Sequence, residues 1–164
     1  MNRRRAARFG AIQALYQAEL SGQDIELVIN EFQAFRLADL LGPLDLDDPA
    51  PEVDRDWFTY VAKGAFDALD DLDQRIGQTL SSGWSLSRLG FLLRAFLRAG
   101  AFELVHCQDV PTKVVINEYL ELAHAFLEKD DIGFLNAVLD RLATEAKTTS
   151  AKTAPPKTAL GSDA

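Results

Sequence analysis

Apolar residues recur at steps of three and four positions along most of the chain, which is the spacing of one face of an α-helix. Valine, isoleucine and threonine are too scattered to give the period-two alternation that marks strands. Glycine, proline, serine and aspartate interrupt the helical pattern between apolar stretches. The pattern therefore predicts an all-α protein with about six helices.

The interruptions set the ends of the predicted helices. Ser21-Gly22, Gly42-Pro43 and Ser81-Ser82-Gly83 end the first three helices. Pro111 suits the first turn of the fifth helix, and Asp130-Asp131 suits the start of the sixth. The predicted helices are residues 3–20, 24–41, 54–80, 86–106 and 111–127 and the segment that follows Asp131.

The order of these helices indicates two packed helical bundles. The first would span residues 3–81 and the second residues 86–147, within one helical domain of residues 1–147. From Lys147 onward the composition changes to alanine, threonine, lysine and proline, with little apolar surface to bury. We therefore expect residues 148–164 to form a disordered tail.

Several classes of protein are disfavoured by composition. No segment approaches the roughly 18 to 20 apolar residues of a membrane-spanning helix, and residues 1–8 lack the apolar stretch of a signal peptide. Cys107 is the only cysteine, which excludes an internal disulfide and a cysteine-rich zinc site. We expect a cytoplasmic protein that does not contact a membrane.

The residues that usually carry catalysis are sparse. His106 and His124 are too far apart for a short metal-binding motif, and neither a glycine-rich phosphate loop nor a Gly-x-Ser-x-Gly motif is present. We interpret both histidines and Cys107 as ordinary structural or surface residues. Four aspartates on the third predicted helix are most simply a solvated face: Asp67, Asp70, Asp71 and Asp73. The sequence predicts neither an enzyme nor a metal or cofactor site.

Charge is distributed unevenly. The formal net charge of −8 disfavours a nucleic-acid-binding protein when it is considered alone. However, four arginines crowd the N-terminus: Arg3, Arg4, Arg5 and Arg8. Cations at a helix N-terminus oppose the helix dipole, so folding alone does not favour them there. They are either a phosphate-binding cluster or a frayed basic end that aids solubility, and charge does not decide between the two.

Further along the same predicted helix are residues that could contact RNA bases. Arg4 and Arg8 share a helix face, and Gln13 and Tyr16 follow on the same helix. An amide can address a base edge and an aromatic ring can stack on a base, although Tyr16 could equally be a half-buried core residue. Because the sequence shows no compensation for these cations, we expect replacing Arg4, Arg5 and Arg8 together by alanine to leave the fold intact or slightly more stable.

Several blocks occur in a characteristic order between residues 3 and 143. They are RRRAAR (3–8) with IQALY (12–16), LD (72–73) with WSLSRL (84–89), RAFLRAGAFEL (94–104), DVPTKVVINE (109–118) with ELA (121–123), and FLNAVLD (134–140). In this combination the chain resembles the NusB family of RNA-binding transcription antitermination factors.

The resemblance implies a fold of two packed helical bundles without catalysis or a cofactor. It further implies binding to a boxA-type RNA element of ribosomal RNA leaders, together with the ribosomal protein NusE, in the transcription elongation complex. Charge and resemblance together give these predicted RNA-binding residues: Arg3, Arg4, Arg5, Arg8, Gln13, Tyr16, Asp130 and Phe134.

The chain departs from the family pattern in three places. Ala137 stands where the motif has glycine, and Thr112 stands where an aromatic residue is common. Residues 90–93 are apolar where the family is usually polar or charged. We therefore expect Phe91, Leu92 and Leu93 to form a remodelled partner-binding edge.

Two other functions fit the same sequence. One is a stand-alone RNA-binding module related to the N-terminal domain of ribosomal RNA cytosine methyltransferases, although no nucleotide-binding α/β domain follows here. The other is a helical protein–protein adaptor in which the arginines are incidental. Phosphate binding weakens steeply with salt whereas apolar docking does not, so salt dependence distinguishes the adaptor from an RNA-binding protein.

Overall fold

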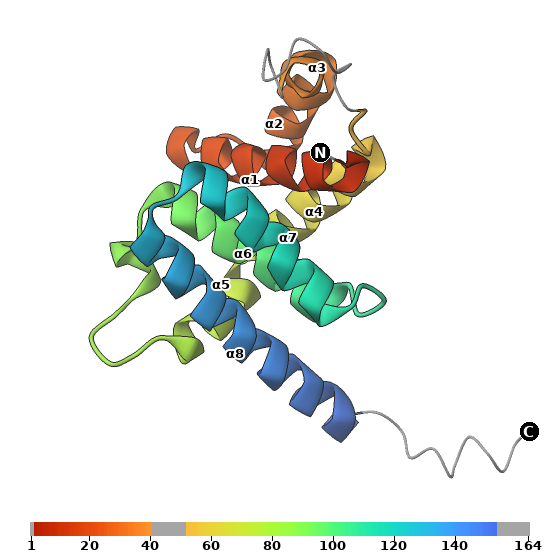
Figure 1. Ribbon diagram of the computed structural model, residues 1–164. Helices are drawn as coiled ribbons and strands as arrows, with labels where there is room; N and C mark the ends of the chain where they lie inside the picture. The colour runs from red at the N-terminus through yellow and green to blue at the C-terminus, as the bar shows by residue number, and fades with distance from the viewer. Residues whose placement is uncertain (1, 41–51, 154–164) are drawn as a thin grey trace, which may run out of the picture.

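The computed structural model describes residues 2–40 and 52–153, with side chains described up to residue 146 (Figure 1). Its first part contains α1 (Arg3–Ser21), α2 (Ile25–Glu31), a π-helical stretch η1 (Phe32–Arg36) and α3 (Leu37–Asp39). The second part contains α4 (Arg55–Asp67), α5 (Leu69–Thr79), a 3₁₀ turn η2 (Leu86–Arg88), α6 (Phe91–His106), α7 (Thr112–Phe126) and α8 (Lys129–Thr153). These residues contain no strand, so the all-α prediction is confirmed.

The ends of α1 follow from local chemistry. Asn2 caps the helix because its Oδ1 accepts a hydrogen bond from the backbone N–H of Arg5, at 2.7 Å. At the other end Gly22 has a φ of 71°, a left-handed conformation that glycine adopts without steric cost. Its N–H donates to the carbonyl of Ala18, at 2.9 Å. These caps define α1 as Arg3–Ser21, so the four arginines lie within its first turns.

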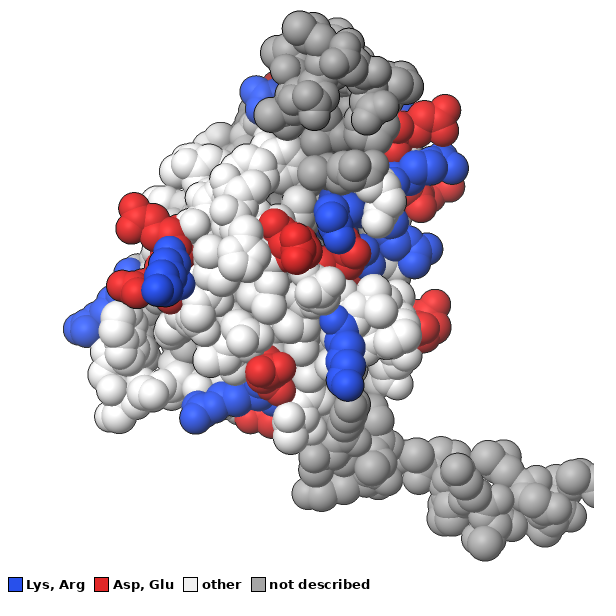
Figure 2. Space-filling model, viewed as in Figure 1, with Lys and Arg blue, Asp and Glu red and all other residues white. Residues whose placement is uncertain are grey.

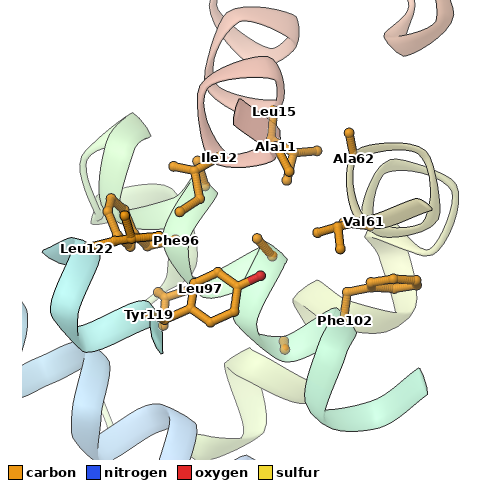
Figure 3. Packing of buried hydrophobic residues seen from close by; sticks show 14 of the residues in the cluster. Ala11, Ile12, Leu15, Val61, Ala62, Phe96, Leu97, Phe102, Tyr119 and Leu122 are labelled. Atoms are coloured by element: carbon orange, nitrogen blue, oxygen red, sulfur yellow. The ribbon is translucent and has the colours of Figure 1, made fainter. Parts of the chain in front are cut away.

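Helix α6 lies at the centre of the molecule and contacts α1, α4, α5, α7 and α8. Every residue from Leu93 to Leu104 is buried. Figure 3 shows side chains of α1, α4 and α7 converging on this helix, with the hydroxyl of Tyr119 directed inward. A helix with apolar residues on every side is expected where neighbours surround it. The two predicted bundles therefore pack against a shared helix and share one apolar core.

The third predicted helix, residues 54–80, is two helices. The backbone of Ala68 leaves the helical range with φ −95° and ψ 16°, which separates α4 from α5. Helix α5 then packs on α6 and α8 more than on α4. The same apolar stripe runs through both helices, so its spacing carried no sign of the break.

Helix α8 begins earlier and ends later than predicted. Asp130 and Asp131 lie in its first turn instead of capping it, where acidic residues favour the helix dipole. The helix continues to Thr153 and so includes residues 148–153, which the sequence assigned to the tail. Residues 154–164 lie outside the described residues, and none of the described helices is long and apolar enough to cross a membrane.

Candidate functional site

The basic cluster lies at the N-terminal end of α1, and its four arginines have different neighbours. Arg3 lies 3.6 Å from Glu52, with both side chains exposed. The guanidinium carbon of Arg4 lies 4.1 Å from the centroid of the Trp57 ring on α4. Stacking on an aromatic ring leaves the edge of a guanidinium group open to hydrogen-bond acceptors. Arg3 and Arg4 therefore both present exposed guanidinium groups at this end of α1.

Arg5 is held by a carboxylate from α7. Its Nε donates to Oε2 of Glu118 at 2.6 Å, and its Nη2 donates to Oε1 of the same residue at 3.0 Å. These two hydrogen bonds lower the pKa of Glu118 and raise the pKa of Arg5. The side chain of Arg5 remains 28% exposed. Arg5 is thus an ordered and partly accessible cation.

Arg8 is buried. Its Nε and Nη2 donate to the carboxylate of Glu103 on α6, at 2.8 and 2.9 Å. Glu103 has no exposed surface and also accepts a hydrogen bond from the hydroxyl of Tyr119. Burial opposes the charge on Arg8, but the hydrogen bonds and charge of Glu103 outweigh it and raise the pKa of Arg8. This ion pair fastens α1 to the central helix.

The expectation that the arginines are uncompensated is therefore wrong. Arg8 is 2% exposed, and removing it would leave the Glu103 carboxylate buried without its cation. Such a loss costs about 3–5 kcal/mol, far more than the about 0.3–1 kcal/mol gained by relieving the helix dipole. The triple alanine variant should lose stability. Burial also argues against a direct contact between Arg8 and RNA.

Gln13 and Tyr16 line one groove on the surface of α1. The groove has a volume of about 560 Å³ and is bordered by the start of α6 and the end of α7. Its floor is apolar, with Phe9, Ile12 and Phe96 among its residues. The ring of Tyr16 is 36% exposed, so it lies at the rim and not in the core. A ring in this position is available for stacking.

The other predicted RNA-binding residues lie at the start of α8. Asp130 is exposed in its first turn. Phe134 is half-buried, and its ring centroid lies 6.1 Å from that of Trp84, which precedes η2. Trp84 is itself 56% exposed. The two rings form an aromatic surface beside Asp130.

The three residues of the predicted partner-binding edge lie in different environments. Leu93 is buried in the core and cannot contact a partner in this conformation. Phe91 is exposed, with the Arg94 guanidinium 4.3 Å from its ring centroid. Leu92 is half-buried and lines the groove that contains Tyr16. Helical spacing explains the division, because consecutive residues of a helix face different directions.

Most of the remaining titratable residues behave as predicted. His106 and His124 are exposed near the ends of α6 and α7. Burial raises the pKa of the Cys107 thiol to about 11, so it is a poor nucleophile. Asp73 differs from the solvated face assigned to it, because it accepts hydrogen bonds from Arg98 at 2.8 and 2.9 Å. Within the described residues, no group of histidine, cysteine and acidic side chains is placed to hold a metal.

Sequence reasoning missed the residues that organise the cluster. Glu103 and Glu118 lie 95 and 113 residues from the arginines that they bind. Trp57 also takes part, because its ring lies beneath Arg4. A signal for Glu103 existed, because a charged residue within an apolar stripe requires a partner. On the face in Figure 2, basic and acidic side chains lie beside one another, with broad uncharged areas between them.

Comparison with known proteins decides the family. The family model described as "NusB family" matches residues 5–144. The chain belongs to the NusB family. A transcription antitermination protein NusB from Rhizobium rhizogenes is 42% identical over 147 residues, which cover 89% of each chain.

Solved structures agree with this assignment to the NusB family. NusB from T. maritima matches with a TM-score of 0.69 at 28% identity, over 88% of this chain and 94% of that one. A second structure contains the antitermination factors NusB and NusE in complex with double-stranded RNA. It matches with a TM-score of 0.66 at 20% identity, over 87% of this chain and 96% of that one, and supports the fold. The predicted NusB resemblance is confirmed.

Proposed function

We propose that this chain is a transcription antitermination factor that binds boxA-type RNA together with the ribosomal protein NusE. Its membership of the NusB family over residues 5–144 carries the proposal. The arginines at the start of α1 supply a suitable chemistry, because guanidinium groups bind phosphate through paired hydrogen bonds. The proposed activity requires neither a catalytic step nor a cofactor, and its setting is the cytoplasm, with no membrane involved.

The proposed RNA-binding surface has two parts. The first consists of Arg3, Arg4 and Arg5, which are exposed or partly exposed at the N-terminal end of α1. The second consists of Gln13 and Tyr16 on α1 and of Asp130 and Phe134 on α8. Arginines would bind the backbone and aromatic rings would stack on unpaired bases. Arg8 belongs to the proposal as the residue that anchors α1.

The partner is proposed to contribute RNA affinity that this chain lacks. A formal net charge of −8 limits the electrostatic attraction available to a few arginines. A composite surface with NusE would add phosphate and base contacts. Phe91 and Leu92 are the accessible residues of the proposed partner-binding edge, whereas Leu93 supports it from the core.

Titration of a labelled boxA-type RNA tests this function. The protein should bind boxA-type RNA more tightly than a scrambled RNA, and NusE should raise the affinity. Binding should weaken as salt increases, because phosphate contacts release counterions. Equal affinity for boxA-type and scrambled RNA would contradict the proposal. Binding to NusE without RNA binding would favour the adaptor, for which the apolar groove on α1 provides a docking surface.

A further inference from the structure

The pairing of Arg5 with Glu118 is unusual for an arginine expected to contact RNA. Both oxygens of Glu118 accept hydrogen bonds from one edge of the guanidinium group, formed by Nε and Nη2. No described residue accepts a hydrogen bond from Nη1 of Arg5. The side chain of Glu118 is 12% exposed, and that of Arg5 is 28% exposed. One edge of Arg5 therefore points into the protein and the opposite edge is left for a ligand.

Other charges close to Arg5 also affect how it could bind a phosphate. Nη1 of Arg8 lies 3.8 Å from Oε2 of Glu118, and the negative charge of Glu121 also acts on Arg5. A carboxylate beside a phosphate-binding arginine repels the phosphate. Glu118 therefore either masks Arg5 from RNA or orients it for RNA. These two roles predict opposite effects of removing its charge.

The geometry favours orientation. Masking would be most effective if the carboxylate occupied the outer edge formed by Nη1 and Nη2, but it occupies the inner edge. A guanidinium group is planar, so two hydrogen bonds on one edge fix the plane and direction of the other edge. Ordering a long side chain before binding lowers the entropic cost of the contact.

We propose that Glu118 is a positioning residue for RNA binding, which holds the outer edge of Arg5 toward a backbone phosphate. This inference rests on the proposed function. The main contribution of Arg5 is then the direction of its hydrogen bonds to the phosphate. Its electrostatic attraction for the phosphate is smaller, since Glu118 already offsets its charge. Helix α7 thereby takes part in RNA binding without touching RNA.

Glu118→Gln is the central variant, with Glu121→Gln as its matched control. Each raises the formal net charge by one and each lies on α7, but the described residues show no hydrogen bond between Glu121 and Arg5. Glu118→Gln should bind boxA-type RNA about two- to tenfold more weakly, despite its more favourable charge. Glu121→Gln should bind equally or slightly more tightly. Tighter binding by Glu118→Gln would establish masking and overturn the proposal.

A double-variant cycle separates positioning from a structural role. In an Arg5→Ala background, Glu118→Gln should no longer weaken RNA binding, because the side chain that it orients is absent. A loss of affinity that persists in this background would mean that Glu118 supports the fold, and it would overturn the proposal. Thermal melts of all four proteins establish which of them are folded.

Arg5→Lys provides a test that leaves Glu118 intact. Lysine keeps the charge but cannot donate from two edges of one plane. The variant should retain the salt dependence of wild type and lose affinity about as much as Glu118→Gln. Equal affinity of Arg5→Lys and wild type would overturn the positioning role while leaving the proposed function in place. If wild type itself does not prefer boxA-type RNA, both fail.

Discussion

Arg8 and Glu103 meet in the interior, where each satisfies a charge that would otherwise be costly. Arg8→Ala should lower the free energy of unfolding by about 3–5 kcal/mol, because Glu103 would remain buried without a cation. Arg4→Ala removes only an exposed contact with Trp57 and should cost about 0.5–1 kcal/mol. Urea denaturation of both variants measures the difference.

A double substitution checks the cause of that loss. Arg8→Met with Glu103→Gln removes both charges and keeps an acceptor for the hydroxyl of Tyr119. It should recover much of the stability lost in Arg8→Ala, since apolar replacements of buried ion pairs are often well tolerated. If Arg8→Ala is as mild as Arg4→Ala, the buried pair does not anchor α1.

The ionisation of Glu118 makes the free energy of unfolding depend on pH. Hydrogen bonds from Arg5 hold its pKa in the folded protein below the ordinary value of 4.5. A carboxyl group with a lowered folded-state pKa stabilises the protein above its unfolded pKa, and this stabilisation is lost as pH falls through the folded pKa. Wild type should therefore lose stability more steeply than Glu118→Gln between about pH 5 and pH 3.

Urea denaturation at several pH values measures this effect. At pH 7 wild type should be more stable than Glu118→Gln, and the two should converge in acid. Parallel curves for wild type and Glu118→Gln would show that the hydrogen bonds with Arg5 do not contribute to stability.

At the scale of elements, a glycine sets the approach of α4 to α6. A Cβ at Gly64 would lie 2.2 Å from Cζ of Phe102. That ring also contacts the rings of Tyr60 and His106, at centroid distances of 5.3 and 5.2 Å, so it has little freedom to move. Gly64→Ala should destabilise the protein by about 1–3 kcal/mol through overpacking.

Gly77 on α5 is the matched control for Gly64. Apart from Gly77 itself, its two chain neighbours and the adjacent helix backbone, no heavy atom lies within 4 Å of a Cβ built there. Gly77→Ala should stabilise the protein by about 0.5–1 kcal/mol, because alanine loses less backbone entropy than glycine in a helix. Thermal unfolding should therefore move in opposite directions for the two variants. A stabilising Gly64→Ala would mean that α4 and α6 are not in close contact at this position.

The elements also show what periodicity can predict. It gave most helices and their breaks, including Ser21-Gly22, because these depend on neighbouring residues. It missed the break at Ala68, where an unbroken apolar stripe passes from one set of neighbours to another. It also missed the break at Leu89-Gly90, which separates η2 from α6. It located the arginines but not Glu103 and Glu118, because ion pairs between distant segments depend on the packing of α1 against α6 and α7. Helical spacing separates Phe91 from Leu93, and packing decided which of the two lies in the core.

For the whole molecule, long-range and short-range electrostatics act in opposite directions. The formal net charge of −8 repels RNA at a distance, while Arg3, Arg4 and the outer edge of Arg5 attract it at the N-terminal end of α1. If these three residues contact phosphates of single-stranded RNA, the logarithm of the affinity should fall with the logarithm of salt with a slope of about −2. Fluorescence anisotropy between about 0.05 and 0.3 M salt measures this slope.

Substitutions of individual residues show which of them contribute to this salt dependence. Arg4→Ala should flatten it by about 0.7, the value of one phosphate contact. The Arg8→Met and Glu103→Gln double variant should leave it unchanged, because that buried pair contributes no net charge at the surface. A slope near zero in wild type would mean that apolar docking dominates, as in an adaptor. A much steeper slope would mean that cations outside α1 also bind RNA, and the basic cluster would then be one part of a larger surface.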